Sequence, residues 1–124
     1  MKLAIVGSSV LTHLQAENAR WLVQCVLDFH QPELVISGGA PGVDTIVANA
    51  VYASKRFALK EFLPEHHSWD GTERLTGFKH RNMQIAAACD YLVCIRNPDS
   101  QTYGSGWTAN YAETLGKTVR RIYV

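Results

Sequence analysis

Residues 34–44 read LVISGGAPGVD, an apolar run followed by three glycines, a proline and the start of a helical pattern. A short apolar run that meets such turn residues predicts a buried strand leading into a helix. Gly38 and Gly39 can present successive N–H groups with no Cβ in the way, and Pro41 suits the first turn of a helix. Free N–H groups at the positive end of a helix predict an anion site for a phosphate. A plain turn that needs glycine for its dihedral angles is the alternative interpretation.

The same alternation of strand and helix continues along the whole chain. Short apolar runs, which predict strands, occupy residues 3–6, 34–36, 59–63, 91–95 and 119–124. Side chains at helical spacing mark four helices, in the sets Leu22, Cys25, Val26 and Phe29; Val43, Ile46, Val47, Ala50 and Val51; Phe78, Asn82, Ile85, Ala86 and Cys89; and Thr108, Tyr111, Ala112 and Leu115.

Apolar strands without polar alternation are buried on both faces, as in a parallel sheet with helices on each side. The chain therefore predicts a single α/β domain over residues 1–124. It is a Rossmann-like three-layer fold with a five-stranded, mainly parallel sheet in the order 3-2-1-4-5 and about four helices. Lys60 and Glu61 interrupt the third strand, which favours a place for that strand at an edge of the sheet.

The predicted topology also indicates where a ligand would bind. In open α/β sheets, ligands bind beyond the carboxyl ends of the strands, where the strand order reverses. Here that place lies between the first and fourth strands. The loops expected to arrive there are residues 7–9, 37–42 and 96–106, all rich in small or polar side chains.

The composition is that of an ordinary globular protein of 124 residues, 47% hydrophobic and 19% charged, with a net charge of +1. This net charge gives no general attraction for nucleic acid or for a membrane. No apolar run approaches the ~18 residues of a spanning helix, and the N-terminus does not read as a signal peptide. Cys25, Cys89 and Cys94 lie in apolar stretches without metal-type spacing. They predict reduced core residues of a cytoplasmic protein.

Small and polar residues follow the first predicted strand. Gly7, Ser8 and Ser9 could hold a phosphate or a ribose. They could equally form a turn before Thr12 and Gln15, which match the capping-box pattern at the start of a helix. The two interpretations are compatible, because capping uses the threonine and leaves the serines available.

Two further features are expected at the same edge of the sheet. Gly104, Ser105 and Gly106 open the fourth helix, and two glycine-rich helix starts can bracket one phosphoryl group. A flexible loop is the alternative. Arg81 lies in a basic cluster, residues 79–83, where cations oppose the helix dipole. Arg81 is the best candidate for a bidentate grip on a phosphate or a carboxylate, against the alternative of a solvated face.

The sequence predicts no metal site and no cofactor. His66 and His67, with His80 or Asp70, come nearest to a metal site. Adjacent histidines point apart in an extended chain, however, and no ligand pair has the i, i+4 spacing of a helix. The chain also lacks a nucleophile elbow, an HExxH motif and a paired-cysteine zinc signature.

Four motifs stand in a particular order along the chain. They are Gly-Ser after the first strand, Ser-Gly-Gly-Ala-x-Gly-x-Asp at residues 37–44, Arg-Asn-x-x-Ile at residues 81–85 and Gly-x-Gly-x-Thr at residues 104–108. This set resembles the SLOG superfamily, which joins the DNA-processing protein A fold, the LOG-type nucleotide phosphoribohydrolases and small YspA-like single domains. The resemblance covers nearly the whole chain and is closest to the YspA-like group, in which a tryptophan, here Trp69, precedes the Arg-Asn segment.

The resemblance implies a domain that binds a nucleotide or a nucleotide-derived, ADP-ribose-like ligand at the carboxyl edge of the sheet. The residues expected to contact that ligand are Gly7, Ser8, Ser9, Ser37, Gly38, Gly39, Ala40, Gly42, Asp44, Arg81, Asn82, Gly104, Ser105, Gly106 and Thr108. A carboxylate would repel a phosphate, so Asp44 is expected to accept from N–H groups of the first helical turn or from ribose hydroxyls.

The chain departs from the family pattern at two places. LOG-type enzymes carry Pro-Gly-Gly-x-Gly-Thr-x-x-Glu, whose glutamate acts on the N-glycosidic bond. Here Tyr111 stands three places after Thr108, and the nearest carboxylate is Glu113. A Gly-Ser-Arg often follows the first strand in YspA-like domains, whereas this chain has Gly-Ser-Ser and lacks that phosphate-binding arginine. These departures argue against hydrolysis and leave binding intact.

Three functions compete at this stage. The first is a sensing or binding domain for a nucleotide, with Trp107 or Trp69 packed near the base. The second is an N-glycoside hydrolase acting on nucleoside monophosphates, with Arg81, Asp44 and Glu113 as catalytic residues. The third, by analogy with DNA-processing protein A, is a module that handles single-stranded DNA. A homo-oligomer is expected by analogy, and no membrane partner is expected.

Overall fold

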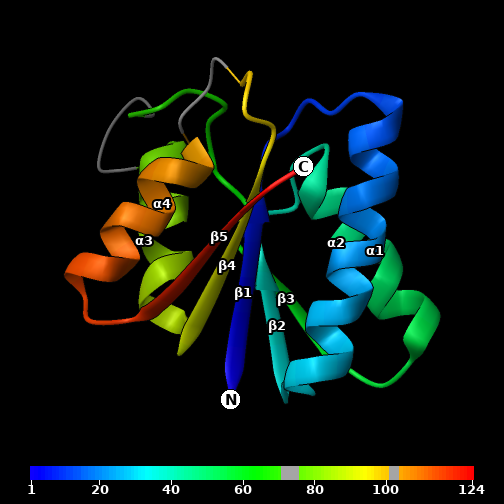
Figure 1. Cartoon of the computed structure of the whole chain (residues 1–124). Helices are drawn as coiled ribbons and strands as arrows, with labels where there is room; N and C mark the ends of the chain where they lie inside the picture. Colours follow the sequence, from blue (N-terminus) through cyan, green and yellow to red (C-terminus); the bar gives the residue numbers. More distant parts are fainter. Residues whose placement is uncertain (71–75, 101–103) are drawn as a thin grey trace.

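The computed structural model describes residues 1–70, 76–100 and 104–124. Its elements follow in the order β1 (Lys2–Gly7), α1 (His13–His30), β2 (Leu34–Ser37), α2 (Val43–Ser54), β3 (Ala58–Glu61), α3 (Phe78–Ala88), β4 (Tyr91–Arg96), α4 (Gly104–Thr114) and β5 (Thr118–Tyr123). The strands form one parallel sheet in the order β3-β2-β1-β4-β5. Figure 1 shows α1 and α2 on one face of this sheet and α3 and α4 on the other. The predicted fold class and strand order are confirmed.

The core lies in two layers, one on each face of the sheet. Along β1, Leu3 and Ile5 pack into the layer beneath α1 and α2, while Ala4 and Val6 pack into the layer beneath α3 and α4. Side chains that alternate between two buried faces explain why this strand is apolar at every position. The chain reverses its strand order at β1, so the carboxyl end of this strand is flanked by loops from both halves of the sheet.

The two edge strands differ from the three central strands. β3 and β5 lie at opposite edges, and polar residues such as Lys60 and Arg120 are exposed on them. The prediction that the third strand lies at an edge is confirmed. Charged side chains on an edge strand discourage it from pairing with another chain. Within the described residues, no helix has the length and apolarity needed to cross a membrane.

Helix α1 begins with the predicted capping box. Gln15 N–H donates to Thr12 Oγ1 at 3.2 Å, and Thr12 N–H donates to Gln15 Oε1 at 2.9 Å. The predicted apolar face of this helix is right only in part, because Leu22 and Val26 pack against the core whereas the fully buried residues are Ala19, Val23 and Leu27. The helix carries one apolar face toward the sheet and a second apolar face toward solvent. The residues with helical spacing in the sequence lie partly on the solvent face and partly between the two faces.

The outer face of α1 also corrects the prediction for one cysteine. Cys25 is exposed, and Phe29 is 82% exposed, whereas Leu22 and Val26 are half-buried at the margin of the core. Cys89 and Cys94 are buried, as predicted. Burial raises the pKa of both buried thiols, which keeps them in the unreactive protonated form.

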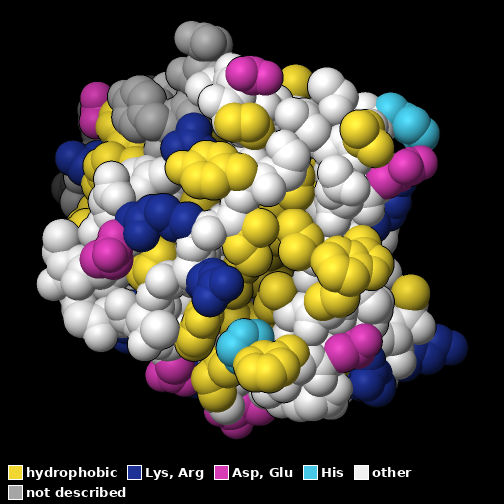
Figure 2. All heavy atoms as spheres, in the orientation of Figure 1, with side chains coloured by type: hydrophobic (Ala, Val, Ile, Leu, Met, Phe, Trp, Pro, Cys, Tyr) yellow, Lys and Arg dark blue, Asp and Glu magenta, His cyan; other side chains and the backbone are white. Residues whose placement is uncertain are grey.

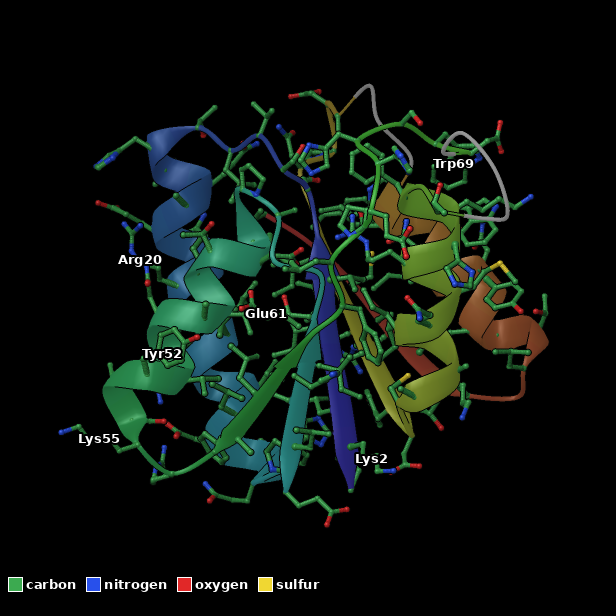
Figure 3. The ribbon with its side chains drawn as sticks, turned by 180° about the vertical axis from the view of Figure 1, so that it is seen from behind. Lys2, Arg20, Tyr52, Lys55, Glu61 and Trp69 are labelled. Atoms are coloured by element: carbon green, nitrogen blue, oxygen red, sulfur yellow. The ribbon has the colours of Figure 1, made fainter. Side chains whose placement is uncertain are left out.

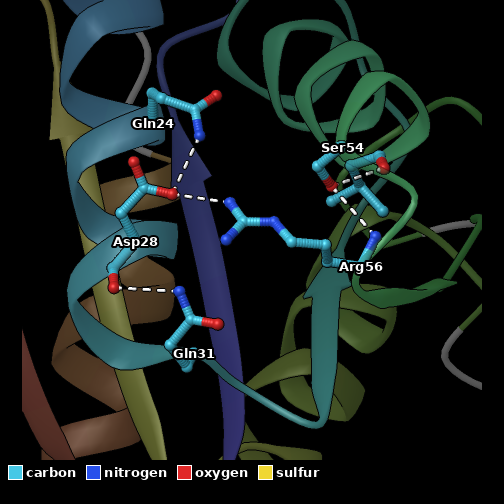
Figure 4. A network of polar contacts seen from close by, with 6 residues as sticks. Gln24, Asp28, Gln31, Ser54 and Arg56 are labelled. Carbon is cyan, nitrogen blue, oxygen red and sulfur yellow. Dashed lines mark hydrogen bonds and ion pairs between the residues drawn. The ribbon is translucent and has the colours of Figure 1, made fainter.

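A polar network joins the end of α1 to the segment that enters β3 (Figure 4). Arg56 Nη2 donates to Asp28 Oδ1 at 2.6 Å, and Gln24 Nε2 donates to the same oxygen at 3.1 Å. These bonds, that from Arg56 above all, lower the pKa of the exposed Asp28 carboxyl. Because both partners are about half exposed, the ion pair adds little stability and serves mainly to fix this corner.

The capping box generates the first testable prediction. Thr12→Ala removes the acceptor for the Gln15 N–H and should lower the free energy of unfolding by about 1 kcal/mol, measured by urea denaturation. Gln15→Ala leaves the Thr12 acceptor in place but removes both the reciprocal bond and the bond from Gln15 Nε2 to Asn97 Oδ1 at 3.1 Å, so its cost reports on those two bonds together. Equal stabilities for Thr12→Ala and the wild type would show that the cap contributes nothing.

Candidate functional site

A cavity of about 560 Å³ opens at the carboxyl edge of the sheet, beside the end of β1, where the strand order reverses. Residues from all three predicted loops and from α3 line it. The residues that were predicted to contact a ligand and that line this cavity are Gly7, Ser9, Ala40, Asp44, Arg81, Asn82, Gly104, Ser105 and Thr108. Residues 101–103 of the third predicted loop lie outside the described residues.

Apolar and aromatic side chains complete the walls of the cavity. Val6 and Ile85 come from β1 and α3, and Pro41 comes from the loop before α2. Trp69 and Phe78 add two aromatic rings. Sequence reasoning named Trp69 as a neighbour of a base but assigned Phe78 and Ile85 to the core, because helical spacing does not show which core-facing side chains border a cavity.

Arg81 reaches from α3 across the floor of the cavity and is 8% exposed. Its Nη1 donates to the Gly38 carbonyl at 2.5 Å, and its Nε donates to Asn82 Oδ1 at 2.8 Å. Its guanidinium also lies 5.5 Å from the centre of the Phe78 ring. These bonds use two of the five N–H donors of the guanidinium. Burial lowers the pKa of Arg81, and the nearby Asp44 opposes that effect.

Asp44 lies in the first turn of α2 and is 6% exposed. Its Oδ2 accepts from the Ala40 N–H at 3.1 Å. Burial raises its pKa to about 6, opposed in part by the Ala40 N–H and by the charge of Arg81. The nearby Ser37 hydroxyl lowers the pKa of Asp44 slightly, because it favours the ionised carboxylate. The geometry of this contact falls short of a hydrogen bond, so Ser37 Oγ and Asp44 Oδ1 have no hydrogen-bond partner within the described residues.

The glycines of residues 37–44 are explained by close approach of the protein to itself. A Cβ on Gly38 would lie 2.7 Å from Arg81 Nη1 and 3.0 Å from Asp44 Oδ2. Gly42 has a φ of +77°, and a Cβ there would lie 2.3 Å from the Ser8 carbonyl oxygen. Gly38, Gly39 and Gly42 do not line the cavity, and Arg81 occupies the space that a phosphate would fill above Gly38.

Ser8 ties three loops together instead of facing the cavity. It is 2% exposed and donates through its N–H to the Ile95 carbonyl at 3.1 Å. Its carbonyl accepts from the Val43 N–H at 3.1 Å, and its Oγ accepts from the Asn97 N–H at 2.9 Å. The end of β1, the start of α2 and the end of β4 therefore hold one another in place.

The residues at the start of α4 that were predicted to contact a ligand lie on two different sides of the helix. Gly104, Ser105 and Thr108 line the cavity, and Thr108 Oγ1 donates to the Gly104 carbonyl at 2.7 Å. Gly106 faces the other side, where a Cβ would lie 2.3 Å from Arg96 Nη1. It borders a smaller cavity of about 290 Å³ together with Arg96, Trp107, Asn110, Arg121 and Tyr123.

The structure places Glu113 outside both cavities. It is exposed near the end of α4 and forms an ion pair with Arg121, which also donates to Asn110. A carboxylate held there lies away from any ligand in the larger cavity. Asp44 is the carboxylate that lines this cavity among the described residues.

Trp69 is held at the rim by the start of α3. The Phe78 N–H donates to the Ser68 carbonyl at 2.8 Å, and the Lys79 N–H donates to the Trp69 carbonyl at 3.0 Å. These bonds occupy N–H groups of the first turn of α3. The Trp69 ring meets Trp107 edge-to-face at 5.2 Å, and Trp107 stacks on Tyr111 at 5.2 Å. Figure 3 shows Trp69 at the carboxyl edge of the sheet, above α3 and α4.

The histidines near this rim make contacts of other kinds. His66 Nδ1 lies 2.8 Å from Thr76 Oγ1, and His67 stacks on Phe78 with ring centres 5.9 Å apart. In the part of the chain that the structure describes, no three His, Cys, Asp or Glu side chains group in a way that could hold a metal ion.

The packing above Gly38 generates a prediction with a matched control. Gly38→Ala forces the Arg81 guanidinium and the Asp44 carboxylate to shift and should lower the free energy of unfolding by roughly 1–3 kcal/mol. Gly104→Ala also adds a methyl group beside the cavity, but its nearest neighbour would be Asn82 Nδ2 at 3.9 Å. It should change stability by no more than about 0.5 kcal/mol. Denaturant unfolding of both variants tests the difference, and equal effects would contradict it.

The raised pKa of Asp44 predicts a pH dependence of stability. The folded pKa is about 6, above the unfolded value of ~3.9, so the protonated carboxyl contributes stability that is complete below about pH 4 and is lost as the pH rises through about 6. Asp44→Asn removes this titration. The free energy of unfolding of the wild type, relative to Asp44→Asn, should fall by roughly 2–3 kcal/mol between about pH 4 and pH 7. Parallel pH profiles for the two proteins would contradict the assignment.

Comparison with known proteins supports the fold. No protein-family model and no curated protein matches the chain. The X-ray structure of TM1055, a Northeast Structural Genomics Consortium target, is 21% identical with a TM-score of 0.72, over 95% of this chain and 71% of that one. DNA processing protein A from Helicobacter pylori, whose structure concerns its single-stranded DNA binding mode, is 20% identical with a TM-score of 0.68. That match covers 98% of this chain, which spans only 64% of the length of that protein. Both matches show that the chain shares its fold with these two proteins.

Proposed function

We propose that this domain binds a nucleotide or a nucleotide-derived, ADP-ribose-like ligand in the cavity of about 560 Å³, as a binding or sensing domain. The observation that carries the proposal is the combination of two aromatic rings, Trp69 and Phe78, with the buried pair Asp44 and Arg81 in one cavity. The volume lies within the range of small-molecule sites, which are mostly apolar with a few convergent polar groups.

The aromatic end of the cavity suits a base. Trp69 stands at the rim and is fixed by its contact with Trp107 and by the backbone bond to Lys79. A planar base that stacks on such a ring gains contact area and little ordering cost, because the ring is already held. Phe78 lines the same cavity and is itself covered by Arg81 and His67.

The floor of the cavity suits a sugar better than a phosphate. Asp44 is the carboxylate that lines the cavity among the described residues. A ribose hydroxyl could donate to this carboxylate, whereas a phosphate placed against its ionised form would be repelled. We place the phosphates on Ser9 and on the start of α4 at Gly104 and Ser105, where the helix dipole favours an anion.

Hydrolysis of an N-glycosidic bond is the second candidate, and it is favoured by one observation. The raised pKa of Asp44, in a cavity and beside a charged partner, is typical of functional carboxylates. In its ionised form, Asp44 would stabilise the positive charge that develops on the sugar ring as the bond to the base breaks. Arg81 would hold the phosphate of the substrate or the carboxylate of Asp44 in position. Glu113 takes no part, because it forms an ion pair with Arg121 outside the cavity.

Single-stranded DNA is the third candidate ligand. The similar structure of DNA processing protein A concerns single-stranded DNA, and rings such as Trp69 and Trp107 are the kind of platform on which bases stack. The net charge of +1 gives weak general attraction for a polyanion. We therefore keep a mononucleotide-sized ligand as the main proposal.

We also propose that the chain associates with copies of itself, independently of ligand binding. Large apolar side chains stand exposed on its surface, among them Trp21 and Phe29. Exposed apolar groups that gather on one face are characteristic of protein interfaces.

Calorimetric titration against a panel of nucleotides, ADP-ribose and single-stranded oligonucleotides tests the ligand proposal. At least one nucleotide-like ligand should bind with a dissociation constant below the millimolar range. Trp69→Ala should weaken that binding about 5- to 150-fold, because loss of a base–aromatic stack costs ~1–3 kcal/mol. Glu113→Gln, which changes a carboxylate outside the cavity, should bind like the wild type.

The same samples separate the three candidates. Release of free base that Asp44→Asn abolishes would establish hydrolysis, and a stable complex without release would establish binding alone. Salt-dependent binding of oligonucleotides with no binding of mononucleotides would establish the DNA function. No binding to any member of the panel would overturn the proposal.

A further inference from the structure

Helix α1 carries a second apolar face that projects into solvent. Leu14, Trp21 and Phe29 are 65%, 68% and 82% exposed. Together with the exposed Cys25 they recur at intervals of seven, four and four residues, which places them along one line of the helix. This line, here called the α1 ridge, lies opposite the buried residues Ala19, Val23 and Leu27.

The sheet beside α1 offers a recessed apolar surface. On this side Tyr91, Ile122 and Val124 are half-buried and pack against the core layer of α1 and α2. Helix α2 packs on β1, β2 and β3, whereas α4 packs on β5 from the opposite face. Tyr91, Ile122 and Val124, here called the β5 strip, are therefore left partly uncovered.

The α1 ridge and the β5 strip lie on the same face of the molecule. Figure 2 shows hydrophobic side chains gathered across the middle of this face, over β5 and α1. His30 at the end of α1 contacts Tyr91, with ring centres 4.8 Å apart, which joins the two surfaces at one end. One molecule thus presents both a projecting and a recessed apolar surface side by side.

We infer that this face is the interface of a homodimer, in which the α1 ridge of each copy packs on the β5 strip of the other. A two-fold axis that runs between ridge and strip brings each ridge onto the opposite strip, so both contacts form together. A face that carries both complementary surfaces satisfies the requirement of a closed two-fold interface, in which the same patch is used by both subunits. This inference rests on the proposed self-association and not on the proposed ligand.

Two aromatic side chains of the α1 ridge supply a substantial part of the area that a stable dimer needs. A standard interface buries about 800 Å² on each partner, which is roughly one eighth of the 6797 Å² of this chain. Since an aromatic side chain offers about 150–250 Å², the exposed parts of Trp21 and Phe29 together supply on the order of 300 Å². A tryptophan near the middle of the ridge is also the residue type that most often dominates interface energetics.

Sedimentation velocity over a wide concentration range tests the inference on the full chain. The wild type should sediment as a dimer at high concentration. Trp21→Glu and Phe29→Glu should each raise the dimer dissociation constant at least about 30-fold, as expected for central interface residues. Tyr52→Glu is the matched control, because Tyr52 is 64% exposed on the outer side of α2, as Figure 3 shows. It should leave the dimer unchanged.

The alkylation rate of Cys25 gives a second measurement that does not depend on a substitution. Cys25 is exposed and lies on the ridge, while Cys89 and Cys94 are buried. Its alkylation should slow as the wild-type concentration rises and should stay constant in Trp21→Glu. A wild type that remains monomeric overturns both the interface and the self-association. An assembly that Trp21→Glu and Phe29→Glu leave intact overturns the interface alone, and nucleotide titration of these variants reports separately on the ligand.

Discussion

The bond from the Arg81 guanidinium to the Gly38 carbonyl organises the site. It carries a charged side chain from α3 across the carboxyl edge of the sheet to the loop before α2, and so joins the two halves of the fold. Burying that charge requires a counter-charge, which Asp44 supplies, and it requires an absent Cβ, which Gly38 supplies. The glycine, the arginine and the aspartate of the separate motifs are therefore parts of one buried arrangement.

The sequence predicted the architecture because each strand and each helix carries its own local signal. Buried strands are continuous apolar runs, and their alternation with helices determines a parallel sheet. Lys60 marked an edge strand, and Thr12 with Gln15 marked a helix start. The face of α1 was not predictable in this way, since apolar residues on two sides of a helix give spacings that fit more than one face.

The candidate site was predictable in position but not in detail. The reversal of strand order at β1 located the cavity, and residues such as Ser9 and Thr108 fell into it. Glycine spacing suggested a ligand close to the backbone, whereas the atoms that approach Gly38 and Gly42 belong to Arg81, Asp44 and Ser8. A sequence shows that something must come close, but only the packed chain shows whether it is a ligand or another part of the protein.

The three bonds of Ser8 have a consequence for the energetics of any ligand. A loop that is disordered before binding must lose conformational entropy when the ligand arrives, and that loss weakens the affinity. Here the ends of β1 and β4 and the start of α2 have already lost it on folding, because one buried serine fixes all three. This part of the rim is preorganised, so a ligand that touches Gly7 and Ser9 meets a surface whose shape was set when the sheet formed.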